Sequence, residues 1–170
     1  PVEKLTREGQ MWRVSYASGS ILVDKVIIAT EAFIAAELLK EHVSEDACDR
    51  LMSTHYTEYA HVAVGYDEDP WPDYPTDIVL PVGEGGVRKV GAMVLHGRRL
   101  PASVPGGAQM VGVYFNTPPL KDMSDDDIKE EAVKQVNAAF GQAQKPSFVH
   151  LFRYEKGLTI AKPGHYKILN

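Results

Sequence analysis

Cysteine is nearly absent from this sequence, because Cys48 is the only one among its 170 residues. A single cysteine excludes a disulfide framework and a thiolate metal cluster within the chain. An excess of basic residues is missing too, since the formal net charge is -5, and the electrostatic footprint of a nucleic-acid-binding protein is therefore absent. No apolar run approaches the roughly 18 residues of a membrane-spanning helix. These absences predict a cytoplasmic protein with no nucleic-acid partner and no transmembrane segment.

Recognisable catalytic motifs are also missing. The nearest sequence to a Gly-rich phosphate loop is Gly-Glu-Gly-Gly at 83–86, which we expect to be a turn because it separates two strand-like segments rather than a strand and a helix. The six histidines show neither HxxxH nor HxH spacing, so we predict no metal site. No GxSxG nucleophile elbow is present, and at this level the catalytic residues stay unknown.

The start of the chain has the pattern of closely spaced strands. Apolar and polar residues alternate over 11–16, which predicts a half-buried strand, and 20–23 predicts its return after a Ser-Gly turn. The apolar run at 26–29 is continuous, as in a strand buried on both faces. Thr30 follows it and is predicted to cap a helix over 31–42.

The remainder predicts an α+β layer. Five segments have strand character: 58–66, 76–82, 87–97, 109–116 and 147–154. The short links between the middle segments favour antiparallel or mixed pairing. We therefore predict a mixed or antiparallel sheet with flanking helices, preceded by a small β-meander, and an irregular tail after residue 154.

Two further helices are predicted from their capping residues. Ser44 precedes a short polar helix, and Ser124 precedes a longer one with three aspartates in its first turn, where the helix dipole favours them. Apolar residues recur on one face of the longer helix, at Ile128, Ala132, Val136 and Phe140. Gly141 is the expected stop.

Charged and aromatic residues near strand ends are the candidates for substrate binding. Arg98 and Arg99 precede a proline-rich loop, and Arg153 lies at the end of the last predicted strand. Guanidinium groups pair bidentately with carboxylates. We therefore predict these arginines, together with Tyr114, as substrate-binding residues, against the alternative that they are solvated side chains.

Several segments, taken in order, carry a family resemblance. Residues 2–39 combine a strand, a small meander and a return strand ending in small residues (VEKLTREGQMWRVSYASGSILVDKVIIATEAFIAAELL). With 59–73, 78–107, 111–115 and 148–169, they resemble the flavin-containing amine oxidase superfamily. The last four segments are similar to substrate-domain segments of bacterial protoporphyrinogen and coproporphyrinogen oxidases. Members usually carry proline where this chain has Glu31.

The resemblance implies an FAD-dependent oxidoreductase in which the flavin takes hydride from a small-molecule substrate. It implies that 1–30 is the end of the FAD-binding domain and 31–170 is the substrate-binding domain. The chain is then an internal fragment whose partner is the rest of the FAD domain, and it is expected to be inactive in isolation. Relatives of this family also associate peripherally with membranes.

The same resemblance implies four cofactor-binding residues at the edge of the adenine pocket. Val2 would offer backbone hydrogen bonds to adenine, and Ala29, Thr30 and Glu31 would run near the cofactor.

The sequence leaves two questions open. The first is the substrate of the flavoenzyme, which is an amine, a porphyrinogen or, as in phytoene-type desaturases, a polyene. The second is whether the chain is instead a non-catalytic α+β binding module. A free-standing module should pair the first 30 residues into its main sheet, whereas a flavoenzyme fragment should form a separate meander with Val26, Ile27 and Ile28 exposed.

Overall fold

The computed structural model of the chain describes residues 1–79, 90–116, 119–141, 143–165 and 167. The chain divides into two compact units. The first unit consists of Pro1–His55 and Ile160–Asn170, and the second consists of Tyr56–Thr159. No helix in the described part of the chain is long and apolar enough to cross a membrane.

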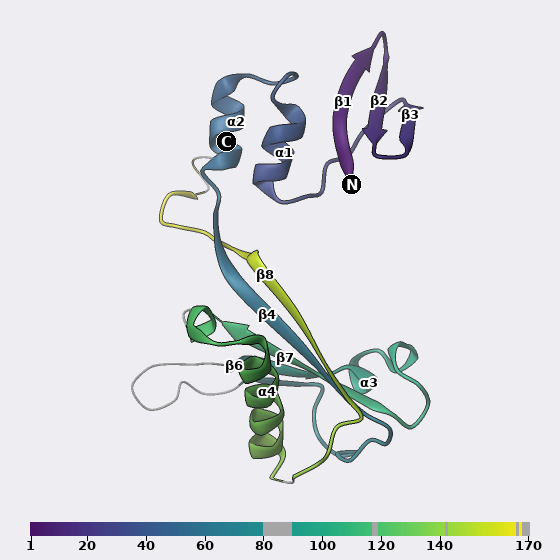
Figure 1. Cartoon of the computed structure of the whole chain (residues 1–170), viewed down its shortest axis with the longest axis vertical. Helices are drawn as coiled ribbons and strands as arrows, with labels where there is room; N and C mark the ends of the chain where they lie inside the picture. Colours follow the sequence, from purple (N-terminus) through teal and green to yellow (C-terminus); the bar gives the residue numbers. More distant parts are fainter. Residues whose placement is uncertain (80–89, 117–118, 142, 166, 168–170) are drawn as a thin grey trace. The chain divides into compact units, whose positions relative to one another are not determined.

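The first unit begins with a three-stranded antiparallel sheet (Figure 1). Its strands are β1 (Val2–Glu8), β2 (Met11–Tyr16) and β3 (Gly19–Val23). The strand pair predicted at 11–16 and 20–23 is confirmed as β2 and β3. Charged residues interrupt the apolar pattern of β1, so the residue pattern did not single this strand out, although the family resemblance implied one there.

The predicted strand at 26–29 is not formed, since residues 25–29 belong to no strand. A continuous apolar strand needs a neighbour on each side, and no described strand pairs with this segment. Ile27 is consequently 93% exposed. Val26 and Ile28 are only partly exposed, so the expected exposed apolar surface is centred on Ile27.

Two helices follow the meander. The helix predicted over 31–42 is α1 (Ala32–Leu39), and its N-cap is Glu31 without a side-chain capping bond. The prediction that Thr30 caps this helix is therefore wrong, because the helix begins one residue later and the Thr30 hydroxyl donates to the Glu31 carbonyl. The second helix, α2 (Glu45–Met52), is capped by Ser44 as predicted, whose side chain accepts a bond from the Ala47 amide.

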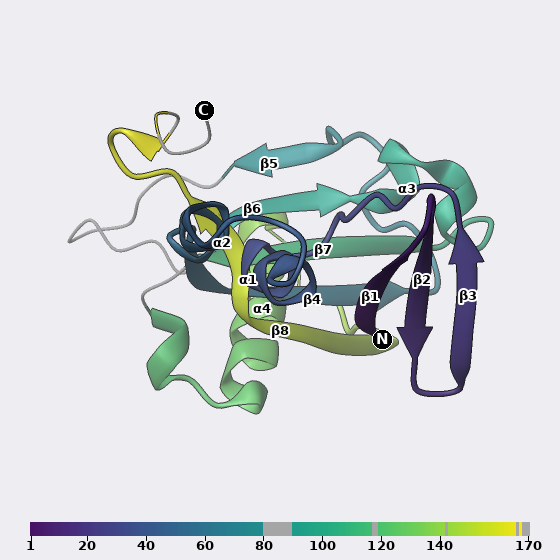
Figure 2. The ribbon, with the colours of Figure 1, turned by 90° about the horizontal axis from the view of Figure 1, so that it is seen from above.

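The second unit is built on a five-stranded sheet in the order β5-β6-β7-β4-β8 (Figure 2). Its strands are β4 (His55–Tyr66), β5 (Asp77–Val79), β6 (Val90–Leu95), β7 (Gln109–Asn116) and β8 (Phe148–Ile160). The pairs β5–β6, β6–β7 and β4–β7 are antiparallel. The predicted α+β class with an antiparallel sheet is confirmed, and the predicted turn at 83–86 lies outside the described residues.

Two local predictions in this unit are wrong. Strand β8 continues to Ile160, so 155–160 is not an irregular tail. The loop expected after 97 contains the short helix α3 (His96–Arg99) and the 3-10 turn η2 (Pro101–Ser103). Both errors arise because strand length and loop shape depend on neighbouring strands rather than on local pattern.

One face of the five-stranded sheet is covered by α4 (Asp125–Phe140). This helix is capped by Ser124 as predicted, and Asp127 completes a capping box with it. The helix ends at the predicted stop, Gly141, which has a left-handed φ of 68°. A second 3-10 turn, η3 (Pro119–Asp122), precedes it. The four predicted apolar residues are buried against the sheet: Ile128, Ala132, Val136 and Phe140.

Among the described residues, the strands of the meander pair only with one another, so the meander and the five-stranded sheet are separate sheets. A non-catalytic module was expected to join them into one sheet. The observed arrangement therefore favours the interpretation of the chain as part of a flavoenzyme.

Candidate functional site

The two faces of the five-stranded sheet differ in chemistry. Side chains alternate between faces along a strand. In β4, Ala60, Val62 and Val64 are fully buried in the core that α4 covers. The alternate positions Tyr59 and His61 are only partly buried. The face opposite α4 therefore carries the accessible side chains of this sheet.

Five rings from three neighbouring strands gather on that opposite face, which we call the aromatic face. Its members are Tyr59 and His61 of β4, Tyr114 of β7, and Phe152 and Tyr154 of β8. Strand β4 lies between β7 and β8, so residues distant in sequence meet here. Phe152 and Tyr154 are 41% and 49% exposed, respectively.

The rings of the aromatic face lie nearly parallel to one another. The His61 ring stacks on Tyr114 at a centroid distance of 4.7 Å and on Phe152 at 5.8 Å, with interplanar angles of 18° and 14°. The Tyr59 ring lies 6.2 Å from Tyr114 and 6.5 Å from Tyr154, at angles of 30° and 26°. Each ring of β4 is thus flanked on both sides by rings of the adjacent strands.

Gly112 of β7 leaves space for two imidazoles. A Cβ atom at this position would lie 2.8 Å from His61 Nε2 and 2.7 Å from His96 Nε2, closer than real Cβ contacts allow. The two imidazole centroids are 6.3 Å apart. Both Nε2 atoms are buried, and neither has a hydrogen-bond partner in the described part of the chain. Glycine therefore permits both imidazoles to pack onto the strand.

Burial shifts the pKa values of three groups of this region, His61, His96 and Tyr59, toward their neutral forms. It lowers the pKa of His61, with a smaller lowering from His96. Burial also lowers the pKa of His96, an effect that the positive charge of Arg99 reinforces and the negative charge of Asp77 opposes. For Tyr59, burial is the main cause that raises the pKa to about 12, with contributions from two neighbouring tyrosines.

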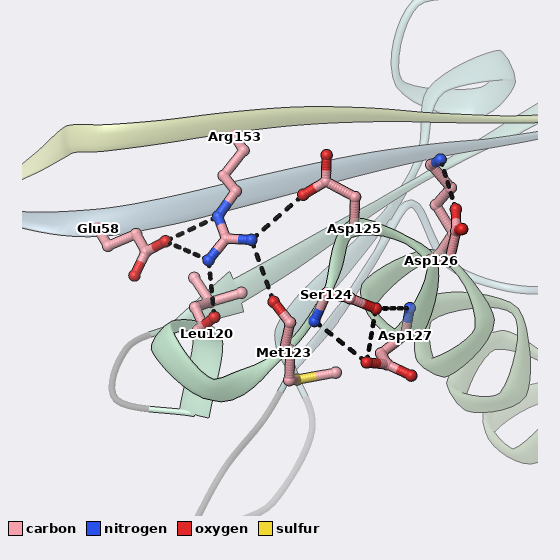
Figure 3. Close-up of polar contacts among 9 residues, drawn as sticks. Glu58, Leu120, Met123, Ser124, Asp125, Asp126, Asp127 and Arg153 are labelled. Atoms are coloured by element: carbon pink, nitrogen blue, oxygen red, sulfur yellow. Dashed lines mark hydrogen bonds and ion pairs between the residues drawn. The ribbon is translucent and has the colours of Figure 1, made fainter.

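Arg153 lies outside the aromatic face and is engaged in an internal network (Figure 3). Its Nε donates to Glu58 at 2.8 Å, and Nη2 lies 2.7 Å from the same carboxylate. Nη1 donates to Asp125 at 3.2 Å and to the Met123 carbonyl at 3.1 Å. Nη2 also donates to the Leu120 carbonyl at 2.8 Å. The guanidinium thus joins β8 to β4 and to the start of α4.

The Arg153 network also shifts its own ionisation. The hydrogen bond to Glu58 is the main cause that raises the pKa of Arg153, and Asp125 adds to the effect. A guanidinium with two carboxylate partners and two carbonyl partners has few donors left for a substrate.

Arg98 is engaged in the same manner. Its guanidinium donates to Asp69 at 2.5 Å and to the Trp71 carbonyl at 2.7 Å. Further bonds go to the carbonyls of Pro72 and Tyr74. These contacts fasten the segment after β4 to α3. The side chain of Arg99 is 62% exposed and lies 3.5 Å from Asp77.

Among the four predicted substrate-binding residues, only Tyr114 belongs to the aromatic face. The residue pattern did not single out Tyr59, His61, Phe152 or Tyr154 as members of one site. Their alternation with apolar core residues along β4 and β8 is visible in the sequence. The neighbourhood of β8 and β4 is not visible there, because more than 80 residues separate the paired positions Gly65 and Ser147.

The predicted cofactor residues lie in the first unit and are accessible. Val2 is 44% exposed and starts β1, which is an edge strand of its sheet. Ala29, Thr30 and Glu31 are exposed and lie outside the strands. Accessible backbone at the start of an edge strand and in an exposed segment is compatible with a cofactor held through backbone groups. No group of three or more potential metal ligands occurs among the described residues.

Comparison with protein families gives a match over residues 1–164 to the family described as flavin containing amine oxidoreductase. No curated protein matches the chain significantly. Similar solved structures exist, and three of them illustrate the range of enzymes that share this fold.

A candidate protoporphyrinogen oxidase from Exiguobacterium sp. 255-15 aligns with 99% of this chain and 37% of its own, at 18% identity and a TM-score of 0.66. Cyclohexylamine oxidase from Brevibacterium oxydans IH-35A aligns with 91% of this chain and 34% of its own, at 12% identity and a TM-score of 0.63. Reduced UDP-galactopyranose mutase aligns with 92% of this chain and 34% of its own, at 12% identity and a TM-score of 0.67.

The chain thus spans about a third of the length of these proteins. At such identities the likeness concerns the fold. The three names describe different reactions, so the neighbours do not select a substrate for this chain.

Proposed function

This chain belongs to the family of flavin-containing amine oxidoreductases, and from that premise we propose that it is the substrate-binding portion of an FAD-dependent oxidoreductase. The observation that carries the proposal is the aromatic face, an accessible ring-lined surface on a sheet whose other face is buried under α4. Substrate pockets are lined mainly by apolar and aromatic side chains with few polar groups. The aromatic face has this composition.

FAD is the cofactor that the family implies, and when bound it accepts the hydride that the substrate loses. The chain's own residues bind and orient the substrate and exclude water from it. Tyr114, His61 and Phe152 form the wall on which the substrate lies. Val2, Ala29, Thr30 and Glu31 contribute the adenine edge of the cofactor site.

We further propose that 1–30 completes an FAD-binding domain and that 31–170 forms the substrate-binding domain. The rest of the FAD domain is then the partner of the meander. In the structure, α1 contacts β1, and the compact units divide between His55 and Tyr56. Helices α1 and α2, the first part of the proposed substrate-binding domain, belong to the same compact unit as the meander.

The substrate classes under this proposal are amines, porphyrinogens and polyenes. A polyene, as in phytoene-type desaturases, is supported by the ring-lined surface. A carboxylate-rich substrate receives less support, because Arg98 and Arg153 already bind internal carboxylates. We propose a cytoplasmic protein, and cell fractionation of the gene product would detect peripheral membrane attachment.

The first experiment is a visible absorption spectrum of the purified full-length gene product that contains this chain. We expect the absorption bands of a bound flavin, followed by turnover in a screen of porphyrinogens, amines and polyenes. A protein that stays colourless after addition of FAD would overturn the proposal. The isolated 170-residue chain should bind FAD weakly or not at all, because it lacks a phosphate-binding loop.

A further inference from the structure

Two histidines from separate strands converge on one glycine of the strand between them. His61 lies in β4, and His96 follows directly after the end of β6. Strand β7, which carries Gly112, runs between β4 and β6. The position of a Cβ atom on Gly112 is 2.8 Å from His61 Nε2 and 2.7 Å from His96 Nε2. The two imidazoles therefore reach across β7 toward the same point.

The two nitrogens at this point are unpartnered. Both Nε2 atoms are buried, and neither has a hydrogen-bond partner in the described part of the chain. A buried polar atom without a partner is unfavourable, because it has lost its hydration and gained no bond in return. A ligand that accepts a lone pair from each nitrogen would remove this penalty at both atoms.

The charge state of the pair suits metal coordination. A histidine coordinates a metal in its neutral form, and burial is the main cause that lowers the pKa of both His61 and His96. Two further charges act on His96, since Arg99 lowers its pKa and Asp77 raises it. These two side chains lie 3.5 Å from each other, so their charges largely offset one another.

The separation of the two rings is also compatible with a shared metal ion. Zinc lies about 2.0–2.1 Å from an imidazole nitrogen, so two coordinating rings can have centroids up to about 6.4 Å apart. The observed centroid distance is 6.3 Å. A tetrahedral angle at the metal requires about 5.2 Å, so the rings need to approach by about 1 Å. Both side chains are only partly buried, and rotation about their side-chain bonds can supply this movement.

We propose that His61 and His96 form a two-histidine site for a divalent transition metal ion such as Zn²⁺, with water completing the coordination. Imidazole nitrogen is a ligand that suits zinc, copper and nickel, whereas magnesium and calcium prefer oxygen. This inference goes beyond the proposed function and does not depend on the flavin. Spacing in the sequence gave no sign of the pair, because 35 residues separate the two histidines.

Zinc binding is measured on the full-length, untagged gene product after treatment with EDTA and dialysis. Isothermal titration with ZnCl₂ at pH 7.5 should show one saturable site per chain, and zinc should raise the thermal unfolding temperature. MgCl₂ should do neither under the same conditions. The absence of saturable zinc binding, or equal binding of magnesium, would overturn the inference.

Matched variants locate the ion. His61→Gln and His96→Gln should each weaken zinc binding at least about tenfold, because each removes one of two nitrogen ligands. His55→Gln, at the exposed start of β4, should leave the affinity unchanged. Unchanged affinity in either His61→Gln or His96→Gln would refute the assignment to this pair.

A spectroscopic measurement on the wild-type protein does not depend on the folding of any variant. With one equivalent of Cu²⁺, electron paramagnetic resonance should show hyperfine splitting from two imidazole nitrogens. A single coordinated nitrogen, or none, would contradict the proposal. The flavin spectrum is recorded on the same samples, so failure of the metal site and failure of the flavoprotein assignment are separate results.

Discussion

The imidazole of His61 lies parallel to the phenol ring of Tyr114, with centroids 4.7 Å apart and planes 18° apart. The two residues are directly opposite each other in the antiparallel ladder of β4 and β7. Stacked aromatic pairs contribute about 0.5–1.5 kcal/mol beyond their buried area. This pair therefore both joins two strands and forms the centre of the proposed substrate wall.

Tyr114→Leu should weaken substrate binding with little change in cofactor binding. The variant removes a ring of the aromatic face and leaves the first unit, with Val2 and Ala29, untouched. We expect KM to rise about tenfold, on the order of 1.4 kcal/mol, with an unchanged flavin spectrum. Steady-state kinetics of the full-length protein measure this. An unchanged KM would remove Tyr114 from the site.

The two partly buried histidines, His61 and His96, should make stability depend on pH. The pKa of His61 and of His96 is lowered from 6.5 in the folded protein, so the unfolded chain takes up these protons first. Their contribution is fully present above pH 6.5 and is lost as the pH falls through the lower folded-state pKa values.

His61→Phe is the variant that tests this dependence. It keeps a ring in the stack and removes the titrating group, so the decline of the urea midpoint between about pH 7 and 5 should become shallower. His55→Phe, at the exposed start of β4, is the matched control. Equal slopes in wild type and His61→Phe would contradict the prediction.

Arg153→Lys should destabilise the protein, because lysine cannot reproduce the guanidinium bonds to Glu58, Asp125 and the carbonyls near α4. We expect a loss of about 1–3 kcal/mol in the free energy of unfolding, as for hydrogen bonds to charged groups. Urea unfolding measures it.

The control for Arg153 is another arginine-to-lysine change. Arg50→Lys alters an exposed pair with Asp46 on α2 and should cost less than about 0.5 kcal/mol. If both variants lose the same stability, the network of Arg153 has no special structural role.

Gly157→Ala should disturb β8 next to the aromatic face. The new Cβ would lie 2.7 Å from Tyr154 Cβ and 2.8 Å from Tyr59 Cβ, atoms whose positions the backbone determines. The strand must therefore shift, at a cost of about 1–3 kcal/mol. Gly106→Ala, with no atom within 4 Å of its new Cβ, should change stability by less than about 0.5 kcal/mol. Thermal or urea unfolding of the two variants compares them.

Local signals predicted the helices better than the strands. Helix α4 begins after Ser124 and ends at Gly141 as expected, because capping bonds and a left-handed glycine act within a few residues. The segment 26–29 has the pattern of a buried strand but no partner strand among the described residues, so the pattern alone gave a wrong strand prediction. The extension of β8 to Ile160 likewise depends on its neighbour β4.

The predicted site residues show the same difference between what is local in the sequence and what depends on tertiary contacts. Residue type suggested Arg98 and Arg153 as ligands for carboxylates, and both do bind carboxylates, but internal ones. The sequence shows that a guanidinium is present. It does not show whether another part of the chain already binds that guanidinium. Tyr114 lies on the accessible face, because its position in β7 is opposite His61 in β4.

The sequence by itself determined the α+β class, the two serine-capped helices α2 and α4, the small meander and, through resemblance, the family. These follow from periodicity, capping chemistry and ordered segments that are local in the chain. Only the tertiary structure decided that Tyr59, His61, Tyr114, Phe152 and Tyr154 form one surface. The physical reason is the sheet order, since hydrogen bonding of β4 between β7 and β8 brings distant segments together and stacks their rings.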